Sequence, residues 1–337
     1  FPNLEGYIKK KIVLKVSDYR SAIIQGKFLA KKGLWVSEYR IESGLNCGGH
    51  AFATDGLLMG PILSEFSDNR QSLVDQTYEV LEKGLSDLSR IVPRTKLNIK
   101  VTAQGGVGTA KEQSFLIDHY NLDSVGWGTP FLLVPEVTTV DNDTREKLLK
   151  AQERDLYLSD VSPLGVPFNN LRNNSKDIEK SQKINEGKPG SSCPRRFLAL
   201  SNEYGEQGVC TASRKFQKIK IKESNKDNSI LLDKVFEKTC LCMGLAAAAV
   251  INNDIEVNKE SQSVSICPGP NLAYFSKYMS LKEMSNQIYG MSNSITRVDR
   301  PHMFLKELEL YINFLSSKLE EASDDFNKKQ VKYFTSL

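Results

Sequence analysis

Apolar and polar positions change their spacing several times along the first 130 residues. Short apolar runs alternate with longer segments in which apolar residues recur every three or four positions. Short runs are typical of buried strands, and the longer periodic segments are typical of helices. The pattern predicts strands over residues 11–16, 34–40, 97–103 and 123–127. It predicts helices over residues 17–32, 71–91 and 110–120, with Thr109 as the N-cap of the last helix.

This alternation of strands and helices indicates an α/β fold with a parallel sheet. A closed barrel of eight βα units would need about twice as many units as the sequence supplies. Beyond residue 130 the pattern predicts a helix over residues 144–154, a half-exposed strand over 215–222 and a buried helix over 240–251. A long terminal helix over 303–332 carries an apolar stripe that includes Leu305, Leu308, Ile312 and Leu319.

Composition changes mark the expected domain boundaries. Residues 173–192 are polar and rich in Lys, Asn, Ser and Gly, which is typical of a linker, and five of the six cysteines follow it. We therefore expect a first domain over 1–172, a linker over 173–192 and a cysteine-containing region over 193–337. Because the chain starts with Phe1 and at once resembles the interior of a domain, we expect it to be the C-terminal part of a longer protein.

Charge and hydropathy argue against several classes of partner. The net charge is only +4 and the basic clusters are short, so we expect no nucleic-acid partner. No apolar segment reaches the roughly 18 residues that a membrane span needs, so we expect no membrane segment. No signal peptide and no compact disulfide pattern are recognisable. A cytoplasmic location is the resulting prediction.

Glycines follow two of the predicted strands, and a histidine follows a third. Gly105-Gly106 and Gly128-Thr129 end the strands at 97–103 and 123–127. Backbone N–H groups at such turns, together with a helix N-terminus, can hold a phosphate. His50 follows Gly49 after the strand at 34–40, and imidazole is suited to proton transfer near neutral pH.

Three motifs in this order resemble the nitronate monooxygenase family, which includes the flavin-type enoyl-acyl-carrier-protein reductases. They are CGGHAF at 47–52, VTAQGGVGTAKE at 101–112 and DSVGWGTPFLLVPE at 123–136, and the resemblance extends over residues 11–172. It implies an FMN-binding, TIM-barrel-like α/β fold, of which about half of the βα units are present, followed by a C-terminal α+β extension. The missing first half of the barrel, or a second subunit, would then be a partner.

The resemblance also implies roles for individual residues. His50 falls on the family's active-site histidine and would act as acid or base beside the flavin. The phosphate-binding backbone falls on Gly105, Gly106, Gly128 and Thr129, and Gly49 would lie close to the cofactor. The chain departs from the family pattern at Cys47, Gln104, Trp127 and Pro130, where the family carries an arginine at the last position.

The cysteines form a second set of candidate residues. Four thiolates that meet in space can hold an iron–sulfur cluster or a zinc ion. We take Cys193, Cys210, Cys240 and Cys242 as the candidate ligands, although their spacing matches no standard pattern. The alternative is that they are ordinary buried thiols.

Three functions remain open at this point. The first is an FMN-dependent oxidoreductase that acts on a small molecule, such as a nitronate or an enoyl thioester. The second is a barrel enzyme that uses the glycine cradle for a phosphorylated substrate and needs no flavin. The third is a non-catalytic scaffold or cluster-binding protein.

Overall fold

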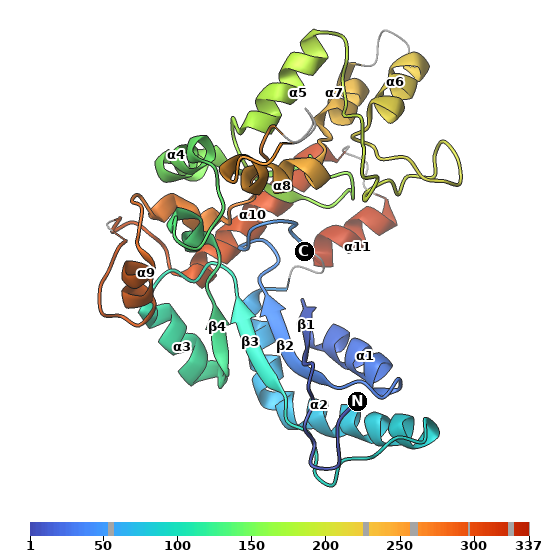
Figure 1. The fold of residues 1–337 in the computed structure, drawn as a ribbon, viewed down its shortest axis with the longest axis vertical. Coiled ribbons are helices and arrows are strands. Elements are labelled where there is room, and N and C mark those ends of the chain that lie inside the picture. The colour runs from blue at the N-terminus through green and yellow to red at the C-terminus, as the bar shows by residue number, and fades with distance from the viewer. Residues whose placement is uncertain (53–56, 225–228, 257–261, 296, 323–326, 337) are drawn as a thin grey trace. The chain divides into compact units, whose positions relative to one another are not determined.

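The computed structural model describes residues 1–52, 57–224, 229–256, 262–295, 297–322 and 327–336 (Figure 1). The chain forms two compact units. Unit 1 contains residues 1–46, 53–127 and 301–337, and unit 2 contains residues 47–52 and 128–300. This division differs from the expected one, because the end of the chain belongs to unit 1 and residues 173–192 lie inside unit 2.

Unit 1 is built on a parallel sheet whose strands follow one another in sequence order. The strands are β1 (Ile12–Val16), β2 (Val36–Glu42), β3 (Lys100–Gln104) and β4 (Ser124–Gly126). The helices that flank them are α1 (Tyr19–Ala30), α2 (Met59–Asp87) and α3 (Ala110–Tyr120) (Figure 1). The predicted parallel α/β arrangement is thus confirmed. No closed barrel forms among the described residues, and the half-barrel interpretation stays a prediction.

The two faces of this sheet have opposite character. Tyr39 and Ile41 of β2 and Ala103 of β3 are buried in the apolar core that the helices cover. The intervening side chains are charged and half-buried: Glu38 pairs with Arg40 of the same strand, and Glu42 pairs with Lys15 of β1. The interior of a TIM barrel is usually filled by bulky apolar side chains. The charged face of this sheet departs from that rule.

Helix α2 begins at Met59, well before the predicted start at residue 71. Its first turns bury Met59, Ile62, Leu63 and Phe66 in the core of unit 1.

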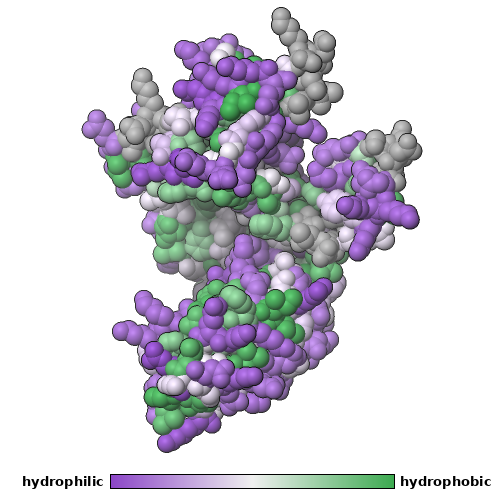
Figure 2. Space-filling view, turned by 90° about the vertical axis from the view of Figure 1, so that its right-hand side faces the viewer, coloured by the Kyte–Doolittle hydropathy of each residue, from purple (hydrophilic) through white to green (hydrophobic). Residues whose placement is uncertain are grey.

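Figure 2 shows one face of the molecule, on which hydrophobic patches lie among hydrophilic residues over unit 1.

The terminal helix begins where it was predicted, as α10 (Met303–Glu321), and α11 (Lys328–Ser336) follows. The buried positions of α10 include Met303, Glu307, Tyr311 and Phe314. The predicted apolar stripe lies on the other side, with Leu305 61% and Ile312 56% exposed. The predicted stripe is therefore largely exposed among the described residues.

Unit 2 combines helices with a two-stranded antiparallel hairpin. The hairpin consists of β5 (Leu156–Ser159) and β6 (Phe168–Leu171). The remaining elements are η2 (Thr129–Leu133), α4 (Asn142–Lys150), η3 (Glu153–Asp155), α5 (Ser175–Asn185), α6 (Arg214–Glu223), α7 (Ser229–Glu237), α8 (Leu241–Asn252), η5 (Pro270–Tyr274) and α9 (Leu281–Ile288). Within the described ranges no strand follows Leu171, so the C-terminal region is helical rather than α+β.

Two sequence predictions in unit 2 need correction. The predicted linker contains helix α5, whose N-cap Asn174 accepts a hydrogen bond from the N–H of Asp177. The predicted strand at 215–222 is helix α6. Its N-cap Ser213 accepts from Phe216, and Phe216 is buried while Lys215 is exposed. The apolar–basic alternation of this segment is therefore compatible with a helix that buries only one side.

Helix α8 confirms the helix predicted at 240–251. The segment Leu232–Asn252, which also includes the end of α7, is long and apolar enough to cross a membrane by length and composition alone. A single such segment is weak evidence for a membrane span, because core helices of soluble proteins pass the same test; 39% of its most apolar 18 residues are buried within the structure.

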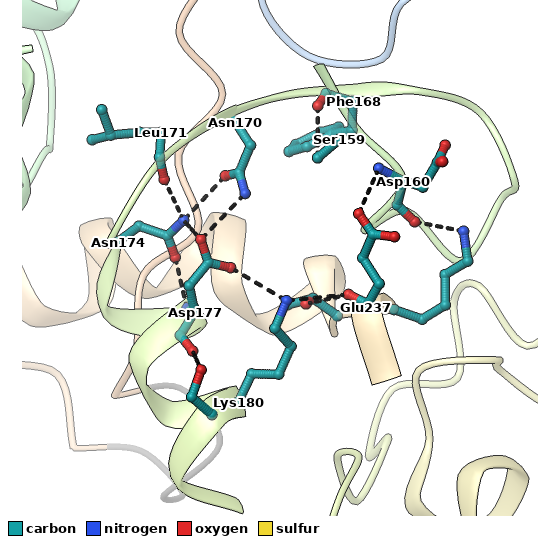
Figure 3. A network of polar contacts seen from close by, with 12 residues as sticks. Ser159, Asp160, Phe168, Asn170, Leu171, Asn174, Asp177, Lys180 and Glu237 are labelled. Carbon is teal, nitrogen blue, oxygen red and sulfur yellow. Dashed lines mark hydrogen bonds and ion pairs between the residues drawn. The ribbon is translucent and has the colours of Figure 1, made fainter. Parts of the chain in front are cut away.

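A polar network connects the hairpin of unit 2 to α5 and to the end of α7 (Figure 3). The amide of Asn174 donates to the carbonyl of Leu171 at 2.7 Å and to the Asp177 carboxylate at 2.8 Å. Lys180 lies between Asp177 and the carbonyl of Glu237. Burial raises the pKa of Asp177 above its usual range. The network holds the hairpin on which the candidate site is built.

Candidate functional site

The Gly-Gly-His segment of unit 2 runs beside β6. The N–H of Ala51 donates to the carbonyl of Pro167 at 2.8 Å, and the N–H of Asn169 donates to the carbonyl of Gly49 at 2.9 Å. The side chain of Asn169 also donates to the carbonyl of Cys47. The backbone on both sides of His50 is therefore fixed by hydrogen bonds to the hairpin.

The imidazole of His50 is held from two directions. Its Nε2 atom lies 2.7 Å from the Oγ atom of Ser162. Its ring packs edge-on against Phe168, with ring centroids 5.0 Å apart. Ser162 is fully buried, and its hydroxyl oxygen accepts a hydrogen bond from the N–H of Leu164. A hydroxyl has one proton and two lone pairs, so Ser162 can still donate to Nε2 or accept from it, and either interaction sets the tautomer of His50.

Gly269 lies between Thr129 and the Gly-Gly-His segment. The N–H of Gly269 donates to Oγ1 of Thr129 at 3.1 Å. A Cβ atom on Gly269 would lie 2.6 Å from that hydroxyl and 3.1 Å from the backbone nitrogen of Gly48. A Cβ atom on Gly48 would lie 2.4 Å from the carbonyl oxygen of Cys267. Glycine is therefore needed at both positions 48 and 269, because a side chain at either one would clash with the neighbouring segment.

Two of the predicted cofactor glycines have open space beside them. A Cβ atom at Gly49 or at Gly128 would meet nothing within 4 Å. Gly49 adopts φ +84°, a conformation that side-chain-bearing residues rarely adopt. The hydroxyl of Thr129, which follows Gly128, still has its own proton to donate after it accepts from Gly269. These three residues fit a phosphate or another anionic oxygen.

Gly105 and Gly106 lie in unit 1 at the end of β3. Both have positive φ, at 122° and 73°. A Cβ atom at Gly106 would lie 2.1 Å from Nδ2 of Asn46, which donates to the carbonyl of Met303. The Oδ1 atom of Asn46 is buried and has no hydrogen-bond partner within the described residues. This turn therefore keeps an unused acceptor beside it, which suits a hydroxyl donor better than a phosphate.

The N-terminus of α3 does not serve as a phosphate site in this structure. Thr109 is its N-cap, as predicted, in a capping box with Glu112. The Glu112 carboxylate is buried and accepts hydrogen bonds from the N–H groups of Gly108, Thr109 and Met303. The Glu112 carboxylate therefore already occupies the N-terminus of α3. The prediction that this helix end contributes to phosphate binding is corrected accordingly.

A second buried carboxylate closes the same end of unit 1. Glu307 of α10 accepts from the hydroxyl of Ser43, just after β2, and from the N–H of Met59 at the start of α2. Burial raises the pKa of Glu307. Helix α10 thus covers the carboxyl ends of β2 and β3, a contact that no local sequence pattern predicts.

Glu42 and Gln104 are polar residues at the ends of β2 and β3 that deserve a place among the candidates. The amide of Gln104 donates to the Glu42 carboxylate at 2.7 Å. In barrel enzymes, polar side chains at the carboxyl ends of strands often carry the chemistry. From sequence, Gln104 was noted only as a departure from the family pattern, and Glu42 was missed because the predicted strand ended at residue 40 whereas β2 continues to Glu42.

The four candidate metal ligands gather in unit 2 as thiols. Cys210 is hydrogen-bonded to Cys193, and burial together with the neighbouring Cys193 and Cys240 raises the pKa of Cys210 to about 12. Burial and the proximity of Cys240 also raise the pKa of Cys242. In the part of the chain that is described, no three His, Cys, Asp or Glu side chains are arranged to hold a metal ion, so the predicted iron–sulfur or zinc site gains no support.

Comparison with known proteins identifies no family. No protein-family model matches the chain, and no curated protein matches it either. Among solved structures, it is similar to FabK from Thermotoga maritima, with 15% identity, a TM-score of 0.40 and coverage of 92% of this chain and 64% of that chain. It is also similar to the enoyl reductase domain of MlnA from the macrolactin biosynthesis cluster of Bacillus amyloliquefaciens, with 15% identity, a TM-score of 0.42 and coverage of 95% and 72%.

These values do not establish a shared fold. The chain spans just under two thirds of the length of the FabK structure. The functional interpretation therefore depends on the residues themselves.

Proposed function

We propose that this chain is part of an FMN-dependent oxidoreductase that acts on a small molecule, with His50 as its acid or base. The observation that carries the proposal is the constraint on the His50 ring. Ser162 engages Nε2 and Phe168 packs against the ring. A general acid or base needs this kind of fixed orientation, because proton transfer depends on distance and alignment.

The residues of unit 2 would hold the cofactor by its phosphate. Gly128 and Gly49 leave open space, and Thr129 has a hydroxyl proton to donate. FMN, when bound, supplies the hydride or electron acceptor and donor that the protein itself lacks. The predicted contribution of Gly105 and Gly106 in unit 1 is left out of this proposal, because the unpaired Oδ1 atom of Asn46 beside Gly106 suits a hydroxyl donor better than a phosphate.

The substrate class follows from the sequence resemblance. His50 would remove a proton from a nitroalkane or related carbon acid, which gives the nitronate, or deliver a proton to the enolate that forms when an enoyl thioester accepts a hydride. The buried hydroxyl of Ser162 cannot itself be an accessible nucleophile, since the residue is fully buried. Its role is to position His50.

The decisive experiment combines cofactor uptake with turnover. The protein is purified anaerobically, its absorbance spectrum is recorded, and FMN is titrated into it. His50→Ala and His50→Gln are assayed with a nitroalkane and with an enoyl thioester plus a reduced nicotinamide donor. The matched control is His119→Gln, because His119 is an exposed histidine that stacks on Phe115 in unit 1.

Both His50 variants are expected to retain FMN and to lose activity by about 10²- to 10⁴-fold, the usual contribution of general acid–base catalysis. The His119 variant should keep the wild-type rate. A protein that is colourless and takes up no FMN would overturn the cofactor assignment, and a His50→Ala variant with full activity would overturn the catalytic role.

A further inference from the structure

A cavity of about 840 Å³ lies in unit 2, and none of the residues assigned to FMN lines it. Small-molecule sites typically have volumes of about 300–1,000 Å³. The cavity is formed by residues 191–210 and the first turns of α6. Its charged lining consists of four basic side chains and one acidic one, namely Arg196, Arg214, Lys215, Lys218 and Glu206.

The basic side chains are placed by fixed backbone. The N–H of Arg214 donates to the carbonyl of Ser191 at 2.7 Å, which holds the start of α6 against the preceding segment. Lys215 and Lys218 lie three residues apart on α6 and so project from the same side of that helix. The guanidinium of Arg196 donates to the carbonyls of Gln207 and Gly208, both at 3.1 Å.

The positive charge of these four side chains is not balanced by ion pairs among the described residues. Within the described ranges, none of the four forms an ion pair, whereas Lys220, further along the same helix, pairs with Glu203 and Glu223. The Nε atom of Arg214 is buried and has no hydrogen-bond partner in the described structure. A buried donor without an acceptor is unfavourable, and an anionic ligand in the cavity would supply the acceptor.

We propose that this cavity binds a phosphorylated small molecule of about nucleotide size. The planar guanidinium groups of Arg214 and Arg196 suit the paired oxygens of a phosphate. Lys215 and Lys218 add positive charge, as does the N-terminal end of α6. The site is separate from the His50 region and does not depend on the flavin assignment.

The test is calorimetric titration of the full-length protein at low ionic strength with inorganic pyrophosphate, ADP and 4′-phosphopantetheine. The variants are Arg214→Gln and Lys218→Gln. The matched control is Lys222→Gln, because Lys222 is an exposed lysine on the same helix that does not line the cavity. Thermal unfolding verifies that each variant is folded.

Wild-type protein is expected to bind pyrophosphate saturably, with an affinity that falls as salt is added. The Arg214→Gln variant should bind at least tenfold more weakly, and the Lys222→Gln variant as tightly as wild type. Lys218 is exposed, so the Lys218→Gln variant should fold normally and weaken binding several-fold even where the Arg214 variant does not fold. Tighter binding of ADP, or of 4′-phosphopantetheine, than of pyrophosphate would support the site and identify the source of the phosphate.

Two results would overturn the proposal: no binding of any of the three probes, or equal binding by wild type and the Lys218 variant. FMN titration separates this proposal from the proposed function. Arg214→Gln should leave FMN uptake unchanged, and changes at Thr129 should leave pyrophosphate binding unchanged.

Discussion

The carboxylate of Glu112 accepts a hydrogen bond from the backbone N–H of Met303 at 2.8 Å, although 191 residues separate them in sequence. The same side chain accepts from the N–H groups of Gly108 and Thr109. One buried carboxylate therefore satisfies the beginnings of both α3 and α10. This use of an acidic side chain is favourable, because helix N-termini carry partial positive charge and unpaired N–H groups.

Replacement of Glu112 by Gln should destabilise unit 1 by about 1–3 kcal/mol, the usual cost of leaving buried donors poorly paired. The amide nitrogen of Gln would face backbone N–H donors that the carboxylate now accepts from. Chemical denaturation measures the effect. Lys111→Gln is the control, because Lys111 is exposed and precedes Glu112 in the same helix turn. Equal stability of the two variants would show that the carboxylate does not hold these helices.

The raised pKa of Glu307 predicts that the stability of unit 1 depends on pH. Burial raises the pKa of this carboxyl above its ordinary value of 4.5. The folded state thus binds the proton more tightly than the unfolded state, so its stabilising contribution is complete below pH 4.5. That contribution is lost as the pH rises through the raised pKa.

The measurement is the difference in unfolding free energy between wild type and Glu307→Gln across that pH range. Gln cannot ionise, so the variant should gain stability relative to wild type as the pH rises above 4.5. A difference that does not vary with pH would contradict this assignment. Glu309→Gln is a suitable control on the same helix, since the Glu309 carboxylate is half exposed and pairs with Lys306.

The strands of unit 1 were predictable from sequence because short strand-like segments, apolar in β1 and alternating between apolar and polar residues in β2, are separated by helical patterns. The hairpin of unit 2 was not. In β6, Phe168 and Leu171 flank two asparagines, which are poor strand residues. Those asparagines are stable there because Asn169 donates to the carbonyl of Cys47, 122 residues away in sequence, and Asn170 donates to Tyr157 of the paired strand β5. No local pattern predicts either contact.

The candidate site, too, could be predicted only in part, because its contacts join residues far apart in sequence. The Gly-Gly-His motif pointed to His50, but its partner Ser162 follows 112 residues later and has no motif of its own. Likewise, the basic face of α6 was interpreted as a strand because apolar and basic residues alternate there. Only the fold shows that Lys215 and Lys218 line a cavity with Arg196.

Alanine substitutions at two glycines near the site should distinguish an effect on packing from an effect on cofactor binding. A methyl group at Gly48 would lie 2.4 Å from a backbone carbonyl, so Gly48→Ala should destabilise unit 2 by about 1–3 kcal/mol, as overpacking usually does. A methyl group at Gly128 meets nothing within 4 Å, and φ there is −121°. Gly128→Ala should therefore unfold like wild type while its affinity for FMN falls. Normal FMN affinity in that variant would exclude the space beside Gly128 as the phosphate position.

Thr129 offers a test by graded substitution. Thr129→Val removes the hydroxyl and should weaken FMN binding by about tenfold or more, since a hydrogen bond to a charged group is worth about 1.5–3 kcal/mol. Thr129→Ser keeps the hydroxyl and should restore most of the affinity. Fluorescence titration of FMN measures both. An unimpaired Val variant would remove Thr129 from the phosphate site.

Ser162 should affect catalysis through the orientation of His50 rather than through substrate binding. Ser162→Ala removes the 2.7 Å contact to Nε2, and we expect kcat to fall by about tenfold or more, within the range of general acid–base effects, while KM stays unchanged. Ser159→Ala is the matched control: Ser159 is a buried serine of the same hairpin whose hydroxyl donates to the carbonyl of Phe168. Both variants lose a buried hydrogen bond, so a general loss of stability would reduce activity in both. A fall in kcat confined to Ser162→Ala would show that the hydroxyl positions His50, whereas equal rates in the two variants would leave it a packing role only.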